Sequence, residues 1–227
     1  MDNAYRTMDL DYMESVIWVF KELYKKNLIY KGVRTSLYCT RCGTPISNFE
    51  IAMDNSYKPM KDPAVTVKFK IKNPDLVLNS GKKDIFFLAW TTTPWTLPSN
   101  RALVVDENEP YLLIEVNKQN DVLILAKKRI KAVLENKKYK VIKTIKGKKL
   151  LGLEYHPPYT FFPPNKKDFK VYSYNEMVNM EEGTGIVHSA PGFGDIDTKM
   201  GQDLGLTIMF SVDDEGKFVE KVEKWKG

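Results

Sequence analysis

Strict alternation of apolar and polar side chains begins at Val65 and continues to Lys72. Apolar residues take every second position, and Thr or Lys takes the positions between them. This period of two predicts a strand with one buried face and one solvent-exposed face. A continuous apolar run follows at residues 85–89, as expected of a strand that is buried on both faces. The chain must therefore build a sheet that is covered by other parts of the molecule.

Further short strands are predicted along most of the chain, together with few helices. We expect helices at residues 10–26, where apolar residues recur at helical spacing, and at residues 127–134. Many short strands with few helices are typical of a barrel or a strongly bent sheet. The predicted fold class is therefore α+β, mainly β, with a bent or barrel-like sheet and peripheral helices. The further strands are expected at residues 102–105, 111–116, 122–125, 139–145 and 169–172.

Composition excludes several classes of protein. The 227 residues are 43% hydrophobic and 28% charged, which is enough for one core with a small appendage. No apolar run approaches the roughly 18 residues that predict a membrane-spanning helix, and the N-terminus does not begin an export signal. Two cysteines cannot form a disulfide scaffold. We therefore expect a cytoplasmic location and no membrane partner.

Positive charge is concentrated in one segment. The net charge is +6, yet residues 127–149 hold eleven basic residues and a single acidic one, Glu135. Such a segment fits phosphate contact by its charge. Lysine-rich strands are, however, commonly just solvated faces, and Arg is the better phosphate ligand but is scarce in this chain. A non-catalytic β-rich module that binds RNA is one hypothesis that this segment leaves open.

A threonine-rich stretch at residues 90–100 directly follows the apolar run. The hydroxyls of Thr91, Thr92 and Thr93 can donate and accept hydrogen bonds, and their methyl groups can shape a small cavity. Pro94 removes a backbone donor and forces the chain out of the strand. The ring of Trp95 can form one wall of that cavity. The alternative interpretation is an ordinary threonine-rich edge strand followed by a turn.

A second candidate stretch covers residues 183–197. His188 and Asp197 lie nine positions apart, with Pro and Gly residues between them that can reverse the chain, so both can line one pocket. Ser189 is a poor partner for His188, because adjacent residues on a strand point to opposite faces. A Ser-His-Asp triad is therefore not favoured. The alternative is a structural histidine whose hydrogen bonds are satisfied by its neighbours. The glycines fit neither a Rossmann nor a P-loop pattern.

Cys39 and Cys42 form a single C-x-x-C pair, which is half of a tetrahedral zinc site. The two histidines lie far from it in sequence, so further ligands would come from outside this chain, or the thiols hold no metal. A thioredoxin-like redox site is not favoured, because it needs a helix after the pair and a strand is expected there.

Taken together, these stretches resemble the editing domain (connective peptide 1) that is inserted in isoleucyl-tRNA synthetases. The resemblance covers nearly the whole chain, in the order of the family. Valyl and leucyl relatives usually carry Arg-Pro where this chain has Thr93-Pro94, which favours the isoleucyl type. Phe193 stands where a His is common and favours the eukaryotic-type branch. The matching segments are residues 11–24, 39–50, 90–100, 150–155 and 183–197.

The resemblance also implies a domain organisation. The His-x-Gly-His and Lys-Met-Ser-Lys-Ser signatures of the catalytic domain are absent from this sequence. The chain is therefore expected to be a ligase fragment that cannot activate an amino acid, with ATP used only by the parent enzyme. We expect a helix and C-x-x-C linker to the absent catalytic domain at residues 1–50, the editing domain at 51–211, and an exit segment at 212–227.

The function implied by the resemblance is post-transfer editing, in which water hydrolyses valyl-tRNA(Ile), with valyl-adenylate as a second substrate. One methylene is worth only about 1–3 kcal/mol of discrimination, a magnitude established for this very family of enzymes and not obtained from this sequence. A second, hydrolytic site is therefore needed. The implied partners are the acceptor 3′ end of tRNA(Ile) carrying valine and the remainder of the parent synthetase. A valyl-type domain that removes threonine is the alternative within this enzyme class.

The resemblance also assigns roles to residues. Asp197 would pair with the α-ammonium of the misattached amino acid. No cofactor is expected for the hydrolysis. Cys39 and Cys42 would be half of a zinc knuckle, with weak or absent zinc in this chain. The implied catalytic residues are Asp197, Thr92, Thr93 and His188, and the implied substrate-binding residues are Thr91, Trp95, Asn100, Gly183, Thr184 and Gly185.

Overall fold

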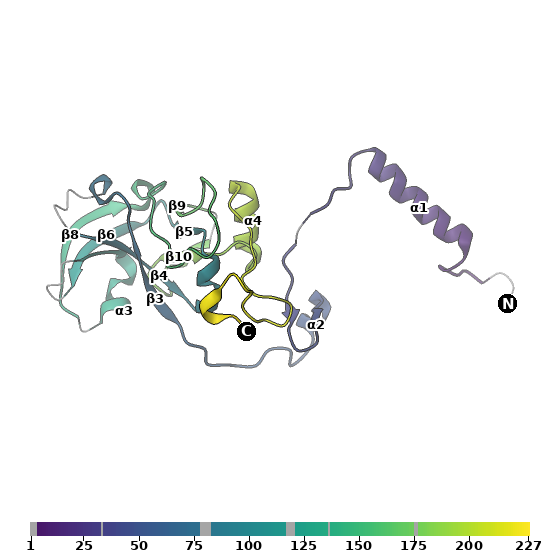
Figure 1. Ribbon diagram of the computed structural model, residues 1–227, viewed down its shortest axis with the longest axis horizontal. Helices are drawn as coiled ribbons and strands as arrows, with labels where there is room; N and C mark the ends of the chain where they lie inside the picture. The colour runs from purple at the N-terminus through teal and green to yellow at the C-terminus, as the bar shows by residue number, and fades with distance from the viewer. Residues whose placement is uncertain (1–3, 33, 78–82, 117–120, 136, 175–176) are drawn as a thin grey trace. The chain divides into compact units, whose positions relative to one another are not determined.

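The computed structural model describes residues 4–32, 34–77, 83–116, 121–135, 137–174 and 177–227. It divides into two units, Met1–Arg34 and Thr35–Gly227. The first unit holds helix α1 (Leu10–Lys25), as predicted (Figure 1). None of the residues of α1 is buried, and its apolar side chains, Trp18 and Phe20 among them, are exposed.

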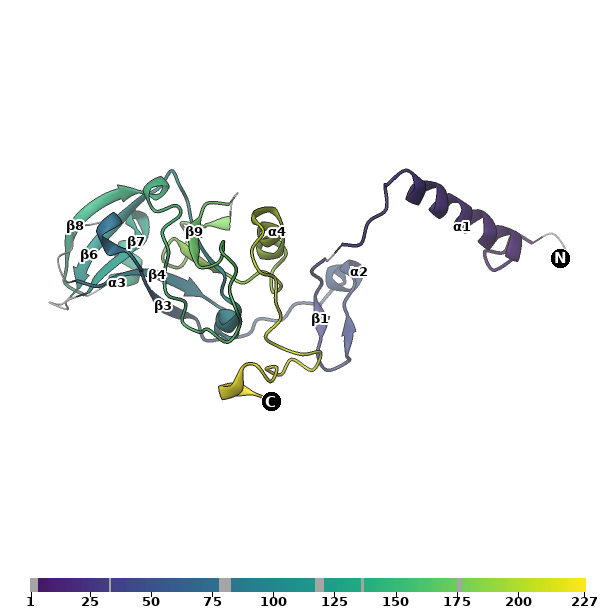
Figure 2. The same ribbon diagram turned by 45° about the horizontal axis from the view of Figure 1, so that its top comes forward.

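The described residues of the second unit include a mixed sheet of eight strands and a separate two-stranded sheet. Figure 2 shows that the eight-stranded sheet is strongly curled, so the predicted mainly β, bent-sheet fold is confirmed. The strand order is β8-β6-β7-β4-β10-β5-β9, and β3 pairs with β4 outside this path. The strands are β3 (Val65–Lys70), β4 (Ile85–Thr91), β5 (Ala102–Val105), β6 (Pro110–Val116), β7 (Val122–Ala126), β8 (Tyr139–Lys146), β9 (Lys170–Tyr172) and β10 (Ile186–Ser189).

Strand β4 pairs with two different parallel strands on the same side, one at its start and the other near its end. Its first residues pair with β7, whereas Trp90 near its end pairs with Val187 of β10, also in parallel. Carboxyl ends of parallel strands lie at the same edge of a sheet, and the place where the neighbour changes leaves a crevice there. The threonine-rich stretch after β4 and the stretch after β10 are thereby brought to one edge.

Buried side chains cover both faces of the middle strands. On β6, Tyr111 and Leu113 join the larger core, while Leu112 and Ile114 join a second cluster. The second cluster is closed by α3 (Ile130–Leu134), which follows the 3₁₀ turn η3 (Lys127–Arg129). The helix expected at residues 127–134 is therefore confirmed. Covered on both faces, β6 and β7 cannot alternate between polar and apolar residues.

Two helices were not predicted. The strands expected around the cysteines shorten to β1 (Tyr38–Cys39) and β2 (Thr44–Pro45), and the chain then turns into α2 (Asn48–Ala52). Ser47 and Glu50 form a capping box that starts α2. Helix α4 (Asp195–Leu204) begins with acidic residues in its first turn and ends at Gly205 with left-handed backbone.

The C-terminal segment, expected from the sequence to be an exit segment at residues 212–227, packs in part against the rest of its unit. Val222 is fully buried, and the ring of Trp225 lies 4.9 Å from that of Tyr159 and 5.8 Å from that of Phe161, centre to centre. Apolar residues near the chain end thus cover the loop between Pro157-Pro158 and Pro163-Pro164. The predicted domain boundaries at residues 50 and 211 stay a prediction.

A buried ion pair joins residues that lie just before β5 and β9. Arg101 and Asp168 have side chains only 1% and 0% exposed, with 3.7 Å between Nη1 and Oδ2. The Asp168 carboxylate also accepts hydrogen bonds from the backbone and hydroxyl of Thr207. Burial lowers the pKa of Arg101, and the charge of Asp168 opposes this shift. The pair ties the start of β5 to the chain that follows α4.

Asp168→Ala is expected to destabilise the fold by about 3–5 kcal/mol, because it leaves the buried Arg101 charge unpaired. The matched control is Asp121→Ala, which removes an exposed ion pair with Lys68 and should cost less than about 1 kcal/mol. Urea unfolding measures both. Equal losses in the two variants would contradict the assignment of Arg101 and Asp168 as the ion pair that fixes these segments.

Candidate active site

A cavity of about 310 Å³ opens at the carboxyl ends of β4 and β10. Eight of the ten residues predicted to form the site line it, and the two exceptions are Trp95 and Asn100. The threonine-rich stretch after β4 and the stretch at residues 183–197 both contribute lining residues, although they lie about ninety residues apart in sequence. The eight are Thr91, Thr92, Thr93, Gly183, Thr184, Gly185, His188 and Asp197.

The three threonines differ in what their hydroxyls do. Thr91 Oγ1 accepts the backbone N–H of Thr93 at 3.0 Å and so forms the turn that leaves β4. Thr93 precedes the 3₁₀ segment η2 (Pro94–Ser99), which Pro94 begins. The hydroxyl of Thr92 has no hydrogen-bond partner among the described residues, and its side chain is exposed in the cavity. Thr92 therefore offers a free hydroxyl to a ligand or a water.

Asp197 lies in the first turn of α4. Oδ1 accepts the backbone N–H of Ala190 at 3.0 Å, and Oδ2 has no hydrogen-bond partner within the described parts of the chain. A Cβ on Gly194 would lie 2.4 Å from Oδ2, so the glycine gives this oxygen its space. The half-buried carboxylate is thus anchored through one oxygen and presents the other to a cationic ligand.

The orientation of the Asn100 side chain is fixed by its surroundings. Its Nδ2 donates to the carbonyl of Ala102 at 3.0 Å, and its Oδ1 accepts from the Tyr155 hydroxyl at 2.7 Å. A carbonyl can only accept, so the amide cannot be flipped without losing this bond. The second proton of Nδ2 points to His188 Nδ1, 3.0 Å away.

These bonds assign the tautomer of His188. Because Nδ1 accepts from Asn100, the ring proton is on Nε2, which donates to Thr96 Oγ1 at 2.8 Å. Thr96 in turn donates to the carbonyl of Thr93 at 2.8 Å. Burial lowers the pKa of His188 to about 4, so the ring is uncharged at neutral pH. Both nitrogens are occupied, and His188 supports the threonine turn but has no free lone pair to accept a proton.

Trp95 and Asn100 act on the cavity through other residues. Trp95 is exposed and packs edge-to-face on Phe193, with 5.2 Å between ring centres, and Phe193 lines the cavity. Asn100 is buried and reaches the cavity only through His188. The hydroxyl of Ser189 is buried without a hydrogen-bond partner, so Ser189 does not pair with His188.

Close packing explains the glycine stretch. Gly183 and Gly185 both have left-handed backbone, with φ of +61° and +73°. A Cβ on Gly183 would lie 2.7 Å from the Trp90 ring, and one on Gly185 would lie 2.3 Å from the Ala126 Cβ. The Thr184 hydroxyl donates to the carbonyl of Leu88 at 2.6 Å. These residues therefore form the wall of the cavity.

Sequence reasoning missed part of the lining. Thr96 lies within the recognised stretch and carries the contact to His188. Met177, Asn179 and Glu182 come from the segment that precedes Gly183. That segment has no helical or strand periodicity that would mark it in the sequence.

The two cysteines do not complete a metal site with the described residues. Cys42 donates its backbone N–H to Cys39 Sγ at 3.3 Å, and hydrogen bonding between the pair lowers the pKa of Cys39 and raises that of Cys42. No group of three or more His, Cys, Asp or Glu side chains comes together in the described ranges. Zinc requires four ligands, so these two thiols do not hold it on their own.

Known proteins match both the sequence and the fold. The model of the family "tRNA synthetases class I (I, L, M and V)" matches residues 1–178, more than half of the chain. The chain belongs to the class I tRNA synthetases.

Isoleucine–tRNA ligases match the synthetase chain over its full length. The enzyme of Clostridium tetani is 43% identical over 227 residues, which is 100% of this chain and 21% of the relative. Those of Clostridium novyi and Rickettsia typhi are 45% and 41% identical, with 20% and 22% of their lengths covered. The chain therefore spans about a fifth of the length of these relatives. The eukaryotic-type branch stays a prediction.

Solved structures share the fold at low identity. The domain GlLeuRS-CP1 matches with a TM-score of 0.53 and 19% identity, over 63% of this chain and 60% of that one. The Plasmodium falciparum cytosolic leucyl-tRNA synthetase editing domain matches with a TM-score of 0.54 and 14% identity, over 62% and 65%. Among the described helices of the synthetase chain, none is long and apolar enough to cross a membrane.

The neutral His188 predicts how stability of the synthetase chain depends on pH. The pKa is 6.5 ordinarily and about 4 when folded. The unfolded chain therefore binds more protons between these values, and stability falls by up to about 3 kcal/mol as the pH drops through this window. Urea unfolding of the wild type and His188→Gln between pH 4 and 7.5 measures the effect. The stability advantage of the wild type should shrink toward pH 4, and parallel curves would contradict a depressed pKa.

Proposed function

We propose that the chain is the editing domain of an isoleucyl-tRNA synthetase and hydrolyses the ester of valyl-tRNA(Ile), with valyl-adenylate as a second substrate. The observation that carries the proposal is the pairing, in one cavity, of a carboxylate oxygen and a hydroxyl that have no partners among the described residues. These are Asp197 Oδ2 and the hydroxyl of Thr92. The sequence match to isoleucine–tRNA ligases supports the choice of tRNA.

Asp197 suits the role of an anchor for the α-ammonium group. An ammonium donates only, and a carboxylate accepts only, so the pair forms a charge-assisted hydrogen bond. Oδ1 is held by the backbone N–H of Ala190, which fixes the direction of Oδ2. The ester carbonyl of the bound amino acid is positioned as a consequence.

Hydrolysis in this cavity relies on the positioning of water. His188 is uncharged and has both nitrogens in hydrogen bonds, so it is not the general base. Asp197 is committed to the ammonium. The free hydroxyl of Thr92 and a ribose hydroxyl of the substrate remain to orient the attacking water, which lowers the entropic part of the barrier.

Selection of valine over isoleucine rests on a rigid wall. The bonds from His188 to Thr96 and from Thr96 to Thr93 fix the turn that shapes the cavity. A wall that cannot yield excludes the larger side chain by overlap, whereas binding alone distinguishes one methylene by only about 1–3 kcal/mol.

The proposed partners are the 3′ end of tRNA(Ile) and the rest of the parent synthetase. The apolar side chains of α1 are exposed, and the chain covers about a fifth of its relatives. We assign that exposed surface to contacts with the remaining domains. ATP would be used only in those domains, and the editing reaction needs no cofactor. The cytoplasm is the proposed location.

Asp197→Asn tests the anchor. Loss of one charged hydrogen bond of about 1.5–3 kcal/mol should lower kcat/KM for valyl-tRNA(Ile) about 10- to 100-fold. The matched control, Asp195→Asn, changes an exposed carboxylate in the same helix turn that does not line the cavity, and should leave the rate unchanged. Release of labelled valine from mischarged tRNA measures both rates. Unchanged hydrolysis by Asp197→Asn would rule out the anchor.

The same assay separates the alternatives. A valyl-type domain would release threonine from threonyl-tRNA(Val) faster than valine from valyl-tRNA(Ile). A non-catalytic RNA-binding module would bind tRNA and release neither amino acid.

Two variants of Thr92 separate the size of the cavity from its hydroxyl. Thr92→Val keeps the volume and removes one hydrogen bond of about 0.5–1.5 kcal/mol, so the deacylation rate should fall about twofold to tenfold. Thr92→Arg fills the cavity and should abolish deacylation while the fold remains, as circular dichroism would report. A wild-type rate in Thr92→Val would show that the hydroxyl does not orient the water.

A further inference from the structure

Three consecutive carbonyls in the glycine wall of the cavity are each held by a different donor. All three donors come from outside the stretch, from β6, β7 and η3. The acceptors are the carbonyls of Gly183, Thr184 and Gly185, and the donors are Arg129 Nε, the backbone N–H of Ala126 and the hydroxyl of Tyr111, at 2.9, 2.9 and 2.8 Å respectively. The backbone of this wall is therefore fixed against the sheet at every residue.

The wall can be fixed only through its backbone. Gly183 and Gly185 have left-handed backbone and no side chains that could pack into a core. A Cβ at Gly185 would lie 2.3 Å from the Ala126 Cβ, so a residue with an anchoring side chain does not fit there. Glycine also has more conformational freedom than any other residue. Hydrogen bonds to the carbonyls thus do the work that packed side chains do elsewhere in the cavity.

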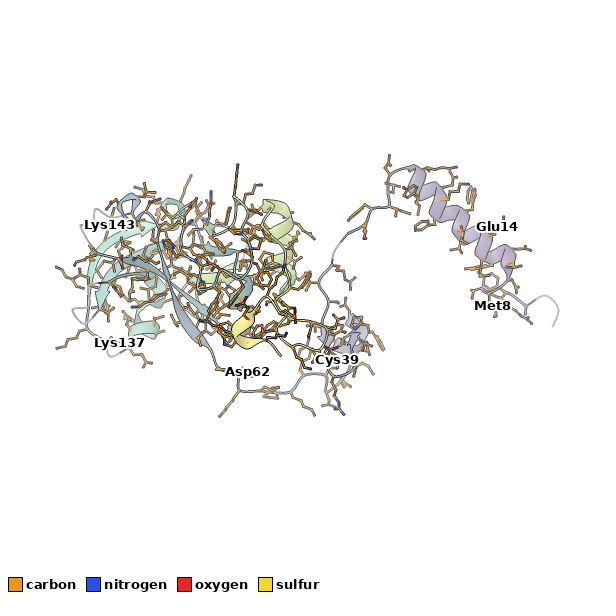
Figure 3. All side chains as sticks on the ribbon, viewed as in Figure 1. Met8, Glu14, Cys39, Asp62, Lys137 and Lys143 are labelled. Atoms are coloured by element: carbon orange, nitrogen blue, oxygen red, sulfur yellow. The ribbon has the colours of Figure 1, made fainter. Side chains whose placement is uncertain are left out.

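Tyr111 holds its carbonyl from a rigid position. Its side chain is fully buried in the larger core, and a Cβ on Gly147 would lie 3.0 Å from its ring. Its strand, β6, lies between β7 and the outer strand β8, which Figure 3 marks with Lys143. The hydroxyl accepts the backbone N–H of Asp106 at 3.0 Å, and its single proton goes to Gly185. Burial raises the pKa of Tyr111, so that proton stays in place at neutral pH.

Arg129 holds the other end of the wall and the turn before it. Besides Gly183, its guanidinium binds the carbonyl of Glu181, with 2.6 Å between Nη1 and the oxygen. A guanidinium presents its donors in one planar fork, so the two carbonyls are held at a fixed spacing. Arg129 is half-buried and follows β7 directly, which places it three residues after Ala126.

We propose that Tyr111 and Arg129 are positioning residues that set the size limit of the cavity by holding its glycine wall in place. The proposal rests on the proposed function and adds a second fixed wall to the threonine turn that His188 supports. Without either donor, the glycine backbone is free to retreat, and the cavity then accepts one more methylene. Loss of a donor should therefore reduce the distinction between valine and isoleucine while the fold is kept.

Tyr111→Phe removes only the hydroxyl. The ratio of kcat/KM for valyl-tRNA(Ile) to that for isoleucyl-tRNA(Ile) should fall at least tenfold, mainly because the isoleucyl ester is hydrolysed faster. A variant that is merely less stable would lose both rates together and keep the ratio. Tyr172→Phe is the matched control, because it removes a hydroxyl bond to the carbonyl of Lys167 away from the cavity, and should change the ratio less than twofold. An unchanged ratio in Tyr111→Phe would overturn the role of Tyr111.

Arg129→Met tests the second donor with a side chain of similar length that cannot donate. The same ratio should fall at least threefold. Lys127→Met is its matched control, because Lys127 is exposed in the same turn and does not line the cavity. A wild-type ratio in Arg129→Met would overturn the role of Arg129.

Binding measurements keep the test independent of hydrolysis. The probes are 3′-deoxyadenosines that carry valine or isoleucine through a 3′-amide in place of the ester. Calorimetry should give at least a tenfold lower Kd for the valyl amide in the wild type, and Tyr111→Phe should remove that preference. If the wild type hydrolyses neither ester but Tyr111→Phe loses a preference that the wild type shows, the proposed hydrolysis fails and the positioning role stands. If the variant keeps the preference, or the wild type has none, the positioning role fails whether or not hydrolysis occurs.

Discussion

Parallel pairing of β4 with β10 is the contact on which the site depends. A single register pair, Trp90 with Val187, joins strands that are separated by almost a hundred residues. Because the strands run in the same direction, both end at one edge, and the chain leaves each of them toward the same crevice. The left-handed glycines at 183 and 185 allow this approach, since a side chain there would overlap Trp90 or Ala126. Without that pairing, Thr92 and Asp197 would not share a cavity.

Hydrogen bonds and burial then determine the charges of the side chains that face the cavity. The chain from Tyr155 through Asn100, His188 and Thr96 to the carbonyl of Thr93 runs in one donor-to-acceptor direction. It fixes the tautomer of His188, whose pKa burial lowers to about 4. The carboxylate of Asp197 has no cationic partner among the described residues. A cavity with one free carboxylate oxygen attracts a cationic group such as an α-ammonium.

The sequence predicted those features that depend on local residue patterns. Alternation at residues 65–72 and the apolar run at 85–89 predicted β3 and β4, because periodicity reports which faces are covered. The threonine and glycine stretches could be found because Thr, Gly and Pro have distinctive backbone and hydrogen-bonding behaviour. Helix α4 was missed, although acidic residues in its first turn and Gly205 after its end were readable signals. The indirect position of Trp95 could not be predicted, since it depends on a tertiary contact with Phe193.

The central claim is that the rigid cavity admits valine and excludes isoleucine. The most direct measurement is the ratio of deacylation kcat/KM for valyl-tRNA(Ile) and isoleucyl-tRNA(Ile), determined with the same preparation of this chain. The account predicts that the valyl ester is hydrolysed at least a hundredfold faster. A pocket that yields would instead favour the larger isoleucyl side chain, because one more buried methylene is worth about 1–3 kcal/mol. Equal hydrolysis of the two esters, or of neither, would contradict it.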